Sequence, residues 1–219
     1  MNVRIMAEAN LQEEKENREG AHRVASLIKK NIDDSPKDAR TCKIIIRNES
    51  KYVLTDPSPF PMCCRSVGDP PPHEIIAKNG DGCAIFSKPR WMPFGCCGLL
   101  SYKVGSKKRL VIMFRNPMIQ LTQKSKSSAA VVMVGEEHTV NEDLYRDMAF
   151  NWERSSYYRP GRYTPAPQFK KQIAAHGEAE LFLDDVKIKF YMTQDTNAVL
   201  TVTLLPGKKE SRTHGPKSP

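Results

Sequence analysis

The feature that most constrains the fold is a series of short apolar runs that begins near residue 42 and continues to residue 205. Short runs rich in β-branched and aromatic residues, bounded by turn-forming residues, are typical of β-strands. Ten candidate strands follow one another: KIIIR, YVL, HEIIA, CAIFS, CGLLSYKV, RLVIMFR, AAVVMV, AELFL, VKIKFYM and AVLTVTLL. The series predicts a mainly β fold, and we expect a β-sandwich of about ten strands flanked by two α-helices.

The segments between these runs carry turn signals. AKNGDG and VGSKK predict tight turns, and Asp184 with Asp185 predicts a two-residue hairpin between two late strands. The segment after the second run is rich in proline. We expect this segment to lie outside the sheet, because proline cannot donate a ladder hydrogen bond; its prolines are Pro57, Pro59, Pro61, Pro70, Pro71 and Pro72.

The first helix is predicted within a charged N-terminal segment, residues 1–40. The stretch AHRVASLIKKNIDD has apolar side chains at helical spacing, which predicts a short amphipathic helix. These side chains are Ala21, Val24, Leu27, Ile28 and Ile32. The sandwich domain is expected to span residues 41–206. A basic tail rich in proline and glycine follows at 207–219, and its composition predicts disorder.

The second helix is predicted in TVNEDLYRDMAFNW, where the series of strands is interrupted. Thr139 is the predicted N-cap, and Glu142, three residues later, would complete a capping box. Leu144 and Met148 then lie on one face of the helix.

The net charge of +9 is unevenly distributed along the chain. Residues 1–40 are balanced, whereas residues 82–135 contain nine Lys or Arg and no Asp or Glu. Such a block favours an anionic partner, and lipid headgroups, nucleic acid and sulfated glycans all meet this description. A solvated basic face without a partner is the alternative.

Motifs that would indicate catalysis are missing from the sequence. The histidines are scattered, no Ser lies in a G-x-S-x-G context, and neither a P-loop nor a G-x-G-x-x-G occurs. We therefore expect no enzyme activity, no catalytic residue and no cofactor.

The six cysteines include two adjacent pairs, Cys63 with Cys64 and Cys96 with Cys97. The N-terminus lacks the apolar stretch of a secretory signal, which predicts a cytoplasmic or non-classically released protein with reduced thiols. Adjacent cysteines lack the spacing of a zinc site, so no metal is expected. In a secreted protein the two pairs could bond to each other across a loop, and the sequence does not choose the partners.

Aromatic side chains occur beside cations in two loops. Trp91 and Phe94 lie in KPRWMPFG, and a second cluster lies in SSYYRPGRY. Amphipathic aromatic residues next to basic ones suit a membrane interface, and they equally suit stacking on bases or sugars. For Trp91 the alternative is a loop side chain folded back over the core.

Motifs between Cys42 and Met192 occur in the same order as in one known family: CKIIIRNES, CRSVGD, GCAIFSK, PFGCCGLLSYKV, RLVIMFRNP, EDLYRDMAF and AHGEAELFL. The chain thereby resembles the actinoporins, which are pore-forming cytolysins of sea anemones, and their relatives in other animals. The resemblance implies a β-sandwich with two flanking helices. It also implies that secreted monomers dock on phosphocholine lipid, release the N-terminal helix, form homo-oligomers and open a cation-permeable pore.

The resemblance also implies a headgroup site. The family uses the Ser of an Arg-Ser-Gly loop, residues after a Gly-Pro, a Ser-Val-Pro turn and tyrosines of the second helix. Adding nearby aromatic and basic side chains, the predicted lipid-binding face consists of Ser66, Trp91, Phe94, Pro117, Lys124, Lys126 and Tyr145. The membrane-inserting residues would be Val24, Leu27, Ile28 and Ile32.

This sequence departs from the family in ways that weaken the implied activity. An aromatic loop is replaced by MIQLTQKSKSSA, and two helix tyrosines are replaced by Ala149 and Phe150, so the aromatic cage for choline is reduced. Lysines in that loop would instead favour anionic headgroups, by about 1 kcal/mol each. The N-terminal apolar stripe covers roughly 22 Å of a hydrocarbon core of roughly 30 Å.

We therefore expect a membrane-lipid-binding, actinoporin-like protein with weakened pore formation. The alternative is a lectin-like carbohydrate-binding or interaction module, because fungal fruit-body lectins resemble this sandwich. Nucleic acid ranks third among partners, since only the charge supports it.

Overall fold

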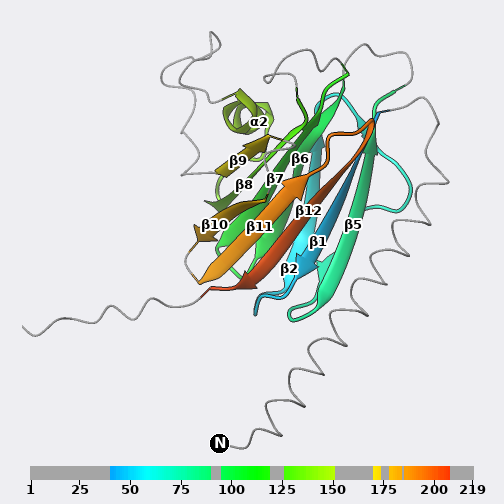
Figure 1. Cartoon of the computed structure of the whole chain (residues 1–219). Coiled ribbons are helices and arrows are strands. Elements are labelled where there is room, and N and C mark those ends of the chain that lie inside the picture. The colour runs from blue at the N-terminus through cyan, green and yellow to red at the C-terminus, as the bar shows by residue number, and fades with distance from the viewer. Residues whose placement is uncertain are drawn as a thin grey trace, which may run out of the picture.

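The computed structural model describes residues 40–89, 95–118, 126–150, 170–173, 178–183 and 185–207. Two stacked β-sheets form the body of the molecule, and one helix lies beside the second sheet (Figure 1). In spatial order, the first sheet contains β10 (Ala179–Leu183), β11 (Val186–Met192), β12 (Asn197–Pro206), β1 (Thr41–Asn48), β5 (Gly80–Ser87) and β3 (Arg65–Ser66). The second contains β4 (Glu74–Ile75), β2 (Leu54–Pro61), β6 (Cys96–Val104), β7 (Lys108–Asn116), β8 (Ser128–Gly135) and β9 (Lys170–Ile173).

The predicted β-sandwich is therefore confirmed, with twelve strands among the described residues. The helix, α2, spans Glu142–Phe150 and follows β8 as predicted. Strands β1 and β12 pair in parallel. All other neighbouring strands among the described residues pair antiparallel, in both sheets. The predicted N-terminal helix and the basic tail lie outside the described residues.

Two apolar clusters hold these layers together. The larger one fills the space between the sheets, with side chains such as Ile44 from β1, Tyr102 from β6 and Phe190 from β11. The smaller one lies between the outer face of the second sheet and α2, and it includes Leu144 and Met148. Strands β6, β7 and β8 are thus buried on both faces, which explains why their central residues are mostly apolar instead of alternating with polar ones.

The proline-rich segment corrects a prediction. Pro57, Pro59 and Pro61 lie within β2, which pairs with β6 in register from Ser58 to Pro61 after a bulge. Beyond Thr55, β2 has a partner on one side alone among the described strands, so alternate residues point their backbone N–H groups away from β6. Pro59 and Pro61 occupy this alternate set, where a missing N–H removes no ladder hydrogen bond, and Pro57 lies in the bulge, without a register partner.

The N-cap of α2 also corrects a prediction. The helix begins at Glu142, and the backbone N–H of Leu144 donates to Asn141 Oδ1 at 3.1 Å. Asn141 is therefore the N-cap, two residues after the predicted Thr139. Threonine and asparagine both favour the N-cap position. Asn141 is the one that directly precedes the first helical residue, and its side chain accepts from the backbone amide of Leu144, three residues later.

Replacing this cap should lower stability measurably. We expect Asn141→Ala to lower the free energy of unfolding by about 1 kcal/mol, because the Leu144 amide loses its partner. Thr139→Ala is the matched control and should change it by less than about 0.5 kcal/mol. Urea unfolding followed by circular dichroism measures both. Equal losses for the two variants, or a larger loss for Thr139→Ala, would contradict the assignment.

Candidate functional site

The register of the strands defines one end of the sandwich. In the first sheet Thr41 of β1 lies opposite both Ser87 of β5 and Asn197 of β12. In the second sheet Cys96 lies opposite Asn116 at the end of β7. These strand ends of the two sheets lie together, because the side-chain amide of Asn116 donates a hydrogen bond to the carbonyl of Thr41. We call this end, which also carries the β7-to-β8 connection, the Asn116 end.

Asn116 joins the two sheets through four hydrogen bonds. Its fully buried side-chain amide donates to the carbonyls of Thr41 at 2.8 Å and Thr196 at 2.9 Å. Its side-chain oxygen accepts from Arg40 Nη1 and from Ser127 Oγ, each at 3.1 Å. One side chain thus fixes β7, the entry to β8, and the starts of β1 and β12 relative to one another. The residues that follow Asn116 leave the sheet from a rigid anchor.

An exposed apolar surface with a cation lies next to this anchor. Phe150, the last residue of α2, is 51% exposed, and Met118 is 47% exposed. The guanidinium of Arg115 lies 5.3 Å from the centre of the Phe150 ring. Pro117 and Lys126 flank this surface along the chain, and both are half-buried. We call Arg115, Pro117, Met118, Lys126 and Phe150 the Phe150 face.

Tyr145, a predicted headgroup residue, lies beneath this face. Its side chain is 4% exposed, and burial together with the neighbouring Cys97 raises its pKa. Its hydroxyl contacts the thiol of Cys97, and its ring meets Phe150 edge-on with centroids 6.4 Å apart. Tyr145 therefore supports Phe150 from the core.

The other predicted residues divide into two groups. Ser66 is exposed on β3, where it pairs opposite Phe86 near the Asn116 end of the first sheet. Pro117 and Lys126 belong to the Phe150 face. The remaining predictions lie outside the described residues: Trp91, Phe94, Lys124, Val24, Leu27, Ile28 and Ile32.

Sequence reasoning missed three members of the Phe150 face. Arg115 was absent because nothing in a single sequence indicates that it meets α2, and the exposure of Met118 has no sequence signal either. Phe150 was interpreted as the loss of a tyrosine, and its spacing of five residues from Tyr145 gives no signal for an aromatic pair, because side chains three or four residues apart are the neighbours on a helix.

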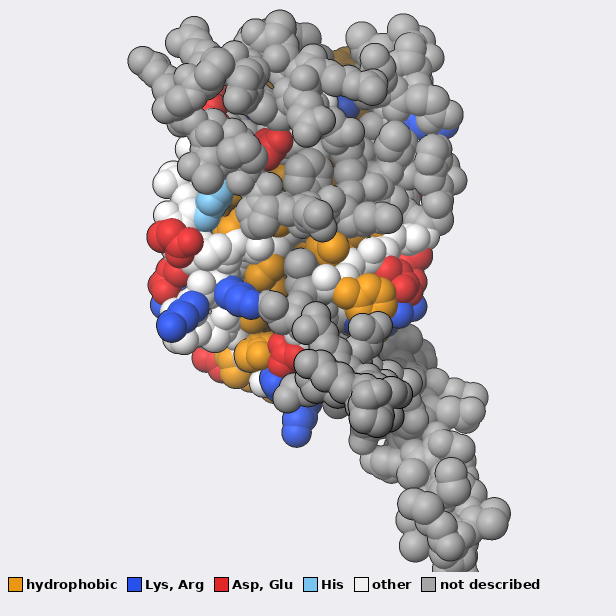
Figure 2. Space-filling view, turned by 90° about the vertical axis from the view of Figure 1, so that its left-hand side faces the viewer, with side chains coloured by type: hydrophobic (Ala, Val, Ile, Leu, Met, Phe, Trp, Pro, Cys, Tyr) orange, Lys and Arg blue, Asp and Glu red, His pale blue; other side chains and the backbone are white. Residues whose placement is uncertain are grey.

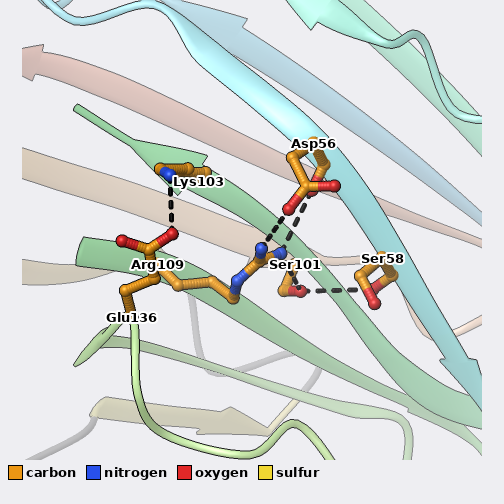
Figure 3. A network of polar contacts seen from close by, with 6 residues as sticks. All are labelled: Asp56, Ser58, Ser101, Lys103, Arg109 and Glu136. Carbon is orange, nitrogen blue, oxygen red and sulfur yellow. Dashed lines mark hydrogen bonds and ion pairs between the residues drawn. The ribbon is translucent and has the colours of Figure 1, made fainter. Parts of the chain in front are cut away.

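Part of the basic block lies at the opposite end of the sandwich, where Lys103 and Arg109 are paired. Gly105, with a φ of +62°, forms the β6-to-β7 turn. Beside it, Lys103 bonds Glu136 at 2.6 Å (Figure 3). Arg109 donates to the hydroxyl of Ser101 at 3.2 Å and forms an ion pair with Asp56. These pairs neutralise two basic side chains that composition alone would assign to a docking surface.

The surface shown in Figure 2 also carries charges of both signs. On this face Lys and Arg side chains lie near Asp and Glu side chains, with hydrophobic side chains between them. Within the described part of the chain, no helix has the length and apolar character needed to cross a bilayer. The same residues contain no group of three or more His, Cys, Asp or Glu placed to hold a metal ion.

Comparisons with known proteins bear on the fold. No protein-family model matches the chain, and no curated protein matches it in sequence. The crystal structure of the lipid binding protein Nakanori is similar, with a TM-score of 0.53 and 11% identity over 91% of this chain and 86% of that one. The lectin XCL of Xerocomus chrysenteron aligns with a TM-score of 0.38 and 9% identity over 75% of this chain and 99% of that one. The likeness to Nakanori shows that the chain has the same β-sandwich fold.

Proposed function

We propose that this protein binds membrane surfaces peripherally through the Phe150 face, with a preference for anionic lipid. The observation that carries the proposal is the exposed Phe150 ring held against the Arg115 guanidinium, with the exposed Met118 three residues after Arg115 in the chain. An apolar side chain next to a cation matches the bilayer interface, where acyl chains lie next to charged headgroups.

The anchoring of the face suits this role. Apolar residues on a rigid support lose little conformational freedom when they enter the interface, so more of their burial contributes to affinity. Asn116 supplies that support on one side, and Tyr145 supplies it under Phe150. The buried position of Tyr145 argues against a family-like tyrosine cage for choline, so phosphocholine should contribute less than negative charge.

The similarity to a protein described as lipid binding supports the same class of ligand, through fold analogy. A carbohydrate is the other class that a β-sandwich with an exposed aromatic ring could bind. The site is proposed to bind and not to catalyse.

Vesicle sedimentation tests the proposal. We expect the full chain to pellet with vesicles that contain phosphatidylserine, to pellet less with pure phosphatidylcholine, and to be released as salt is raised. A glycan array with the same protein distinguishes the alternative. Failure to pellet with either vesicle, at low salt and with the folded protein, would refute membrane binding, and a glycan signal in that case would support the lectin class.

Pore formation is proposed to be weaker than binding. The residues that precede the N-terminal apolar stripe include Glu13 and Glu14, and each carboxylate near the bilayer centre costs about 2.5 to 3.5 kcal/mol. We expect dye release from the same vesicles to remain low at protein concentrations at which most of the protein is bound. Dye release that rises in step with binding would contradict this expectation.

A further inference from the structure

Five of the six cysteines lie at the Asn116 end, outside the Phe150 face: the adjacent pairs Cys63 with Cys64 and Cys96 with Cys97, and Cys42 at the start of β1, which is fully buried in the cluster that contains Cys96. All six are free thiols. The carbonyl of Cys97 accepts hydrogen bonds from the amides of Met62 at 3.0 Å and Cys63 at 3.3 Å, and from the thiol of Cys64 at 3.1 Å. The segment between β2 and β3 is therefore held directly against the start of β6, as the pairing of Pro61 with Gly98 requires.

Apart from Cys42, these cysteines are divided by strand alternation into two pairs on opposite faces of β6. Cys96 points into the core between the sheets, where Cys64 packs against the same cluster. Cys97 points to the other face, in the cluster beneath α2. The thiol of Cys96 lies close enough to that of Cys64 for the two to interact, and the same holds for Cys97 and Cys63. Because the pairs face opposite sides of a strand, the four sulfurs do not surround one point, and they do not form a metal-binding group.

We propose that this cluster is an oxidation site at which Cys63 bonds Cys97 and Cys64 bonds Cys96, giving two parallel disulfides. The oxidant is a small-molecule disulfide such as oxidised glutathione. For each bond, one protein thiolate attacks the small disulfide and displaces the first small thiol. The second protein thiolate then attacks the mixed disulfide and displaces the other. Two protein thiols are oxidised, one small disulfide is reduced to two thiols, and the protons pass to the departing thiolates.

The order of these attacks follows from burial. Cys96 is fully buried, and desolvation raises its pKa well above the ordinary value of a thiol. Burial likewise raises the pKa of Cys97 to about 12, against a lowering by the Tyr145 hydroxyl. Cys63 and Cys64 are half-buried, so they can meet the small disulfide first. Cys96 and Cys97 are thiolates only at high pH, because their pKa values are raised. The rate at which they attack the mixed disulfide and close the protein disulfide should therefore rise about tenfold per pH unit near neutrality.

The disulfides would tie the second sheet to the connection that leads into the first. Residues 64 and 96 bracket β3, β4 and β5, so each bond closes a loop of about 30 residues through both sheets. A bond over such a loop should raise the melting temperature by roughly 10 °C in a domain of this size.

Two double variants of the full chain test the pairing. Cys63→Ser/Cys97→Ser leaves Cys64 with Cys96, which the geometry pairs. Cys64→Ser/Cys97→Ser leaves Cys63 with Cys96, which lie on opposite sides of the strand. The variants are matched, because both keep Cys96 and lose Cys97, and they differ only in which half-buried cysteine remains. Each is incubated with oxidised glutathione and followed by intact mass and melting temperature.

We expect the first variant to lose about 2 Da, roughly tenfold or more faster than the second, and to melt at a higher temperature. Wild type should lose about 4 Da, and neither Cys42→Ala nor Cys83→Ala should change this, because neither residue belongs to the proposed pairs. Equal rates for the two variants would overturn the pairing. So would a loss of mass only in denaturant, a wild-type disulfide to Cys42 or Cys83, or a link between two chains. Circular dichroism before oxidation establishes that each variant is folded.

Discussion

The Asn116→Ala variant is expected to lose about 3 to 5 kcal/mol of the free energy of unfolding, the largest effect of any polar substitution proposed here. The loss is large because the side-chain amide of Asn116 donates to two carbonyls, those of Thr41 and Thr196. The Thr196 carbonyl still accepts from the Thr41 amide at 3.1 Å, but the Thr41 carbonyl and the Ser127 hydroxyl each lose a hydrogen bond inside the protein, and a buried polar group left unpaired costs about 1 to 3 kcal/mol. The cavity left by the missing amide adds to this cost.

Asn197→Ala is the matched control, since it changes the same residue type at the same end of the sandwich. Asn197 is exposed and accepts one hydrogen bond, from the hydroxyl of Thr41 at 2.9 Å. Its loss should cost less than about 1 kcal/mol. Urea denaturation with tryptophan fluorescence measures both variants. A similar, small effect for the two asparagines would show that Asn116 does not hold the sheets together.

The Phe150→Ala variant is expected to bind anionic vesicles about tenfold more weakly than wild type. The ring is half-exposed in solution, so moving it into the interface buries further apolar area, and a buried aromatic side chain contributes about 1.5 to 3 kcal/mol. The substitution also removes the ring that faces Arg115. Sedimentation at a series of lipid concentrations gives the partition coefficient.

Phe182→Ala provides the control for this prediction. Phe182 is 66% exposed on β10 and lies under the ammonium of Lys187, so it is also an aromatic ring beside a cation. Its hairpin joins the part of β12 that ends at Pro206, at the far end of the sandwich from Asn116. We expect its removal to leave vesicle binding unchanged. Equal losses for Phe150→Ala and Phe182→Ala would mean that exposed aromatic area, not the Phe150 face, governs binding.

The strands were predictable because strands buried on both faces are rich in apolar residues, without the polar alternation of a half-exposed strand. The runs LLSYKV and LVIMF have this character, and they form β6 and β7. The short strands β3 and β9 contain RS and KKQI, and their pairing is set by neighbouring strands and not by their own composition. The prolines of β2 misled the prediction because a rule for central strands does not apply where one side of the strand is open.

The candidate site was less predictable because its parts meet through tertiary structure. Arg115 ends a strand and Phe150 ends a helix 35 residues later, and only packing of α2 on the second sheet brings them together. Asn116 similarly lies in the tripeptide RNP, which is typical of an ordinary strand end. Its role depends on the two sheets being stacked, which no local pattern encodes.

Hydrogen exchange with and without anionic vesicles tests the central claim most directly, because it locates the membrane contact without any substitution. We predict slower exchange on vesicles in two peptides, one covering residues 115–128 and one covering the end of α2 at Phe150. Peptides that cover the β6-to-β7 turn at Gly105 and the β10-to-β11 hairpin should exchange at the same rate in both samples. Protection confined to those two turns, with the Phe150 face unchanged while the protein is bound, would contradict the claim.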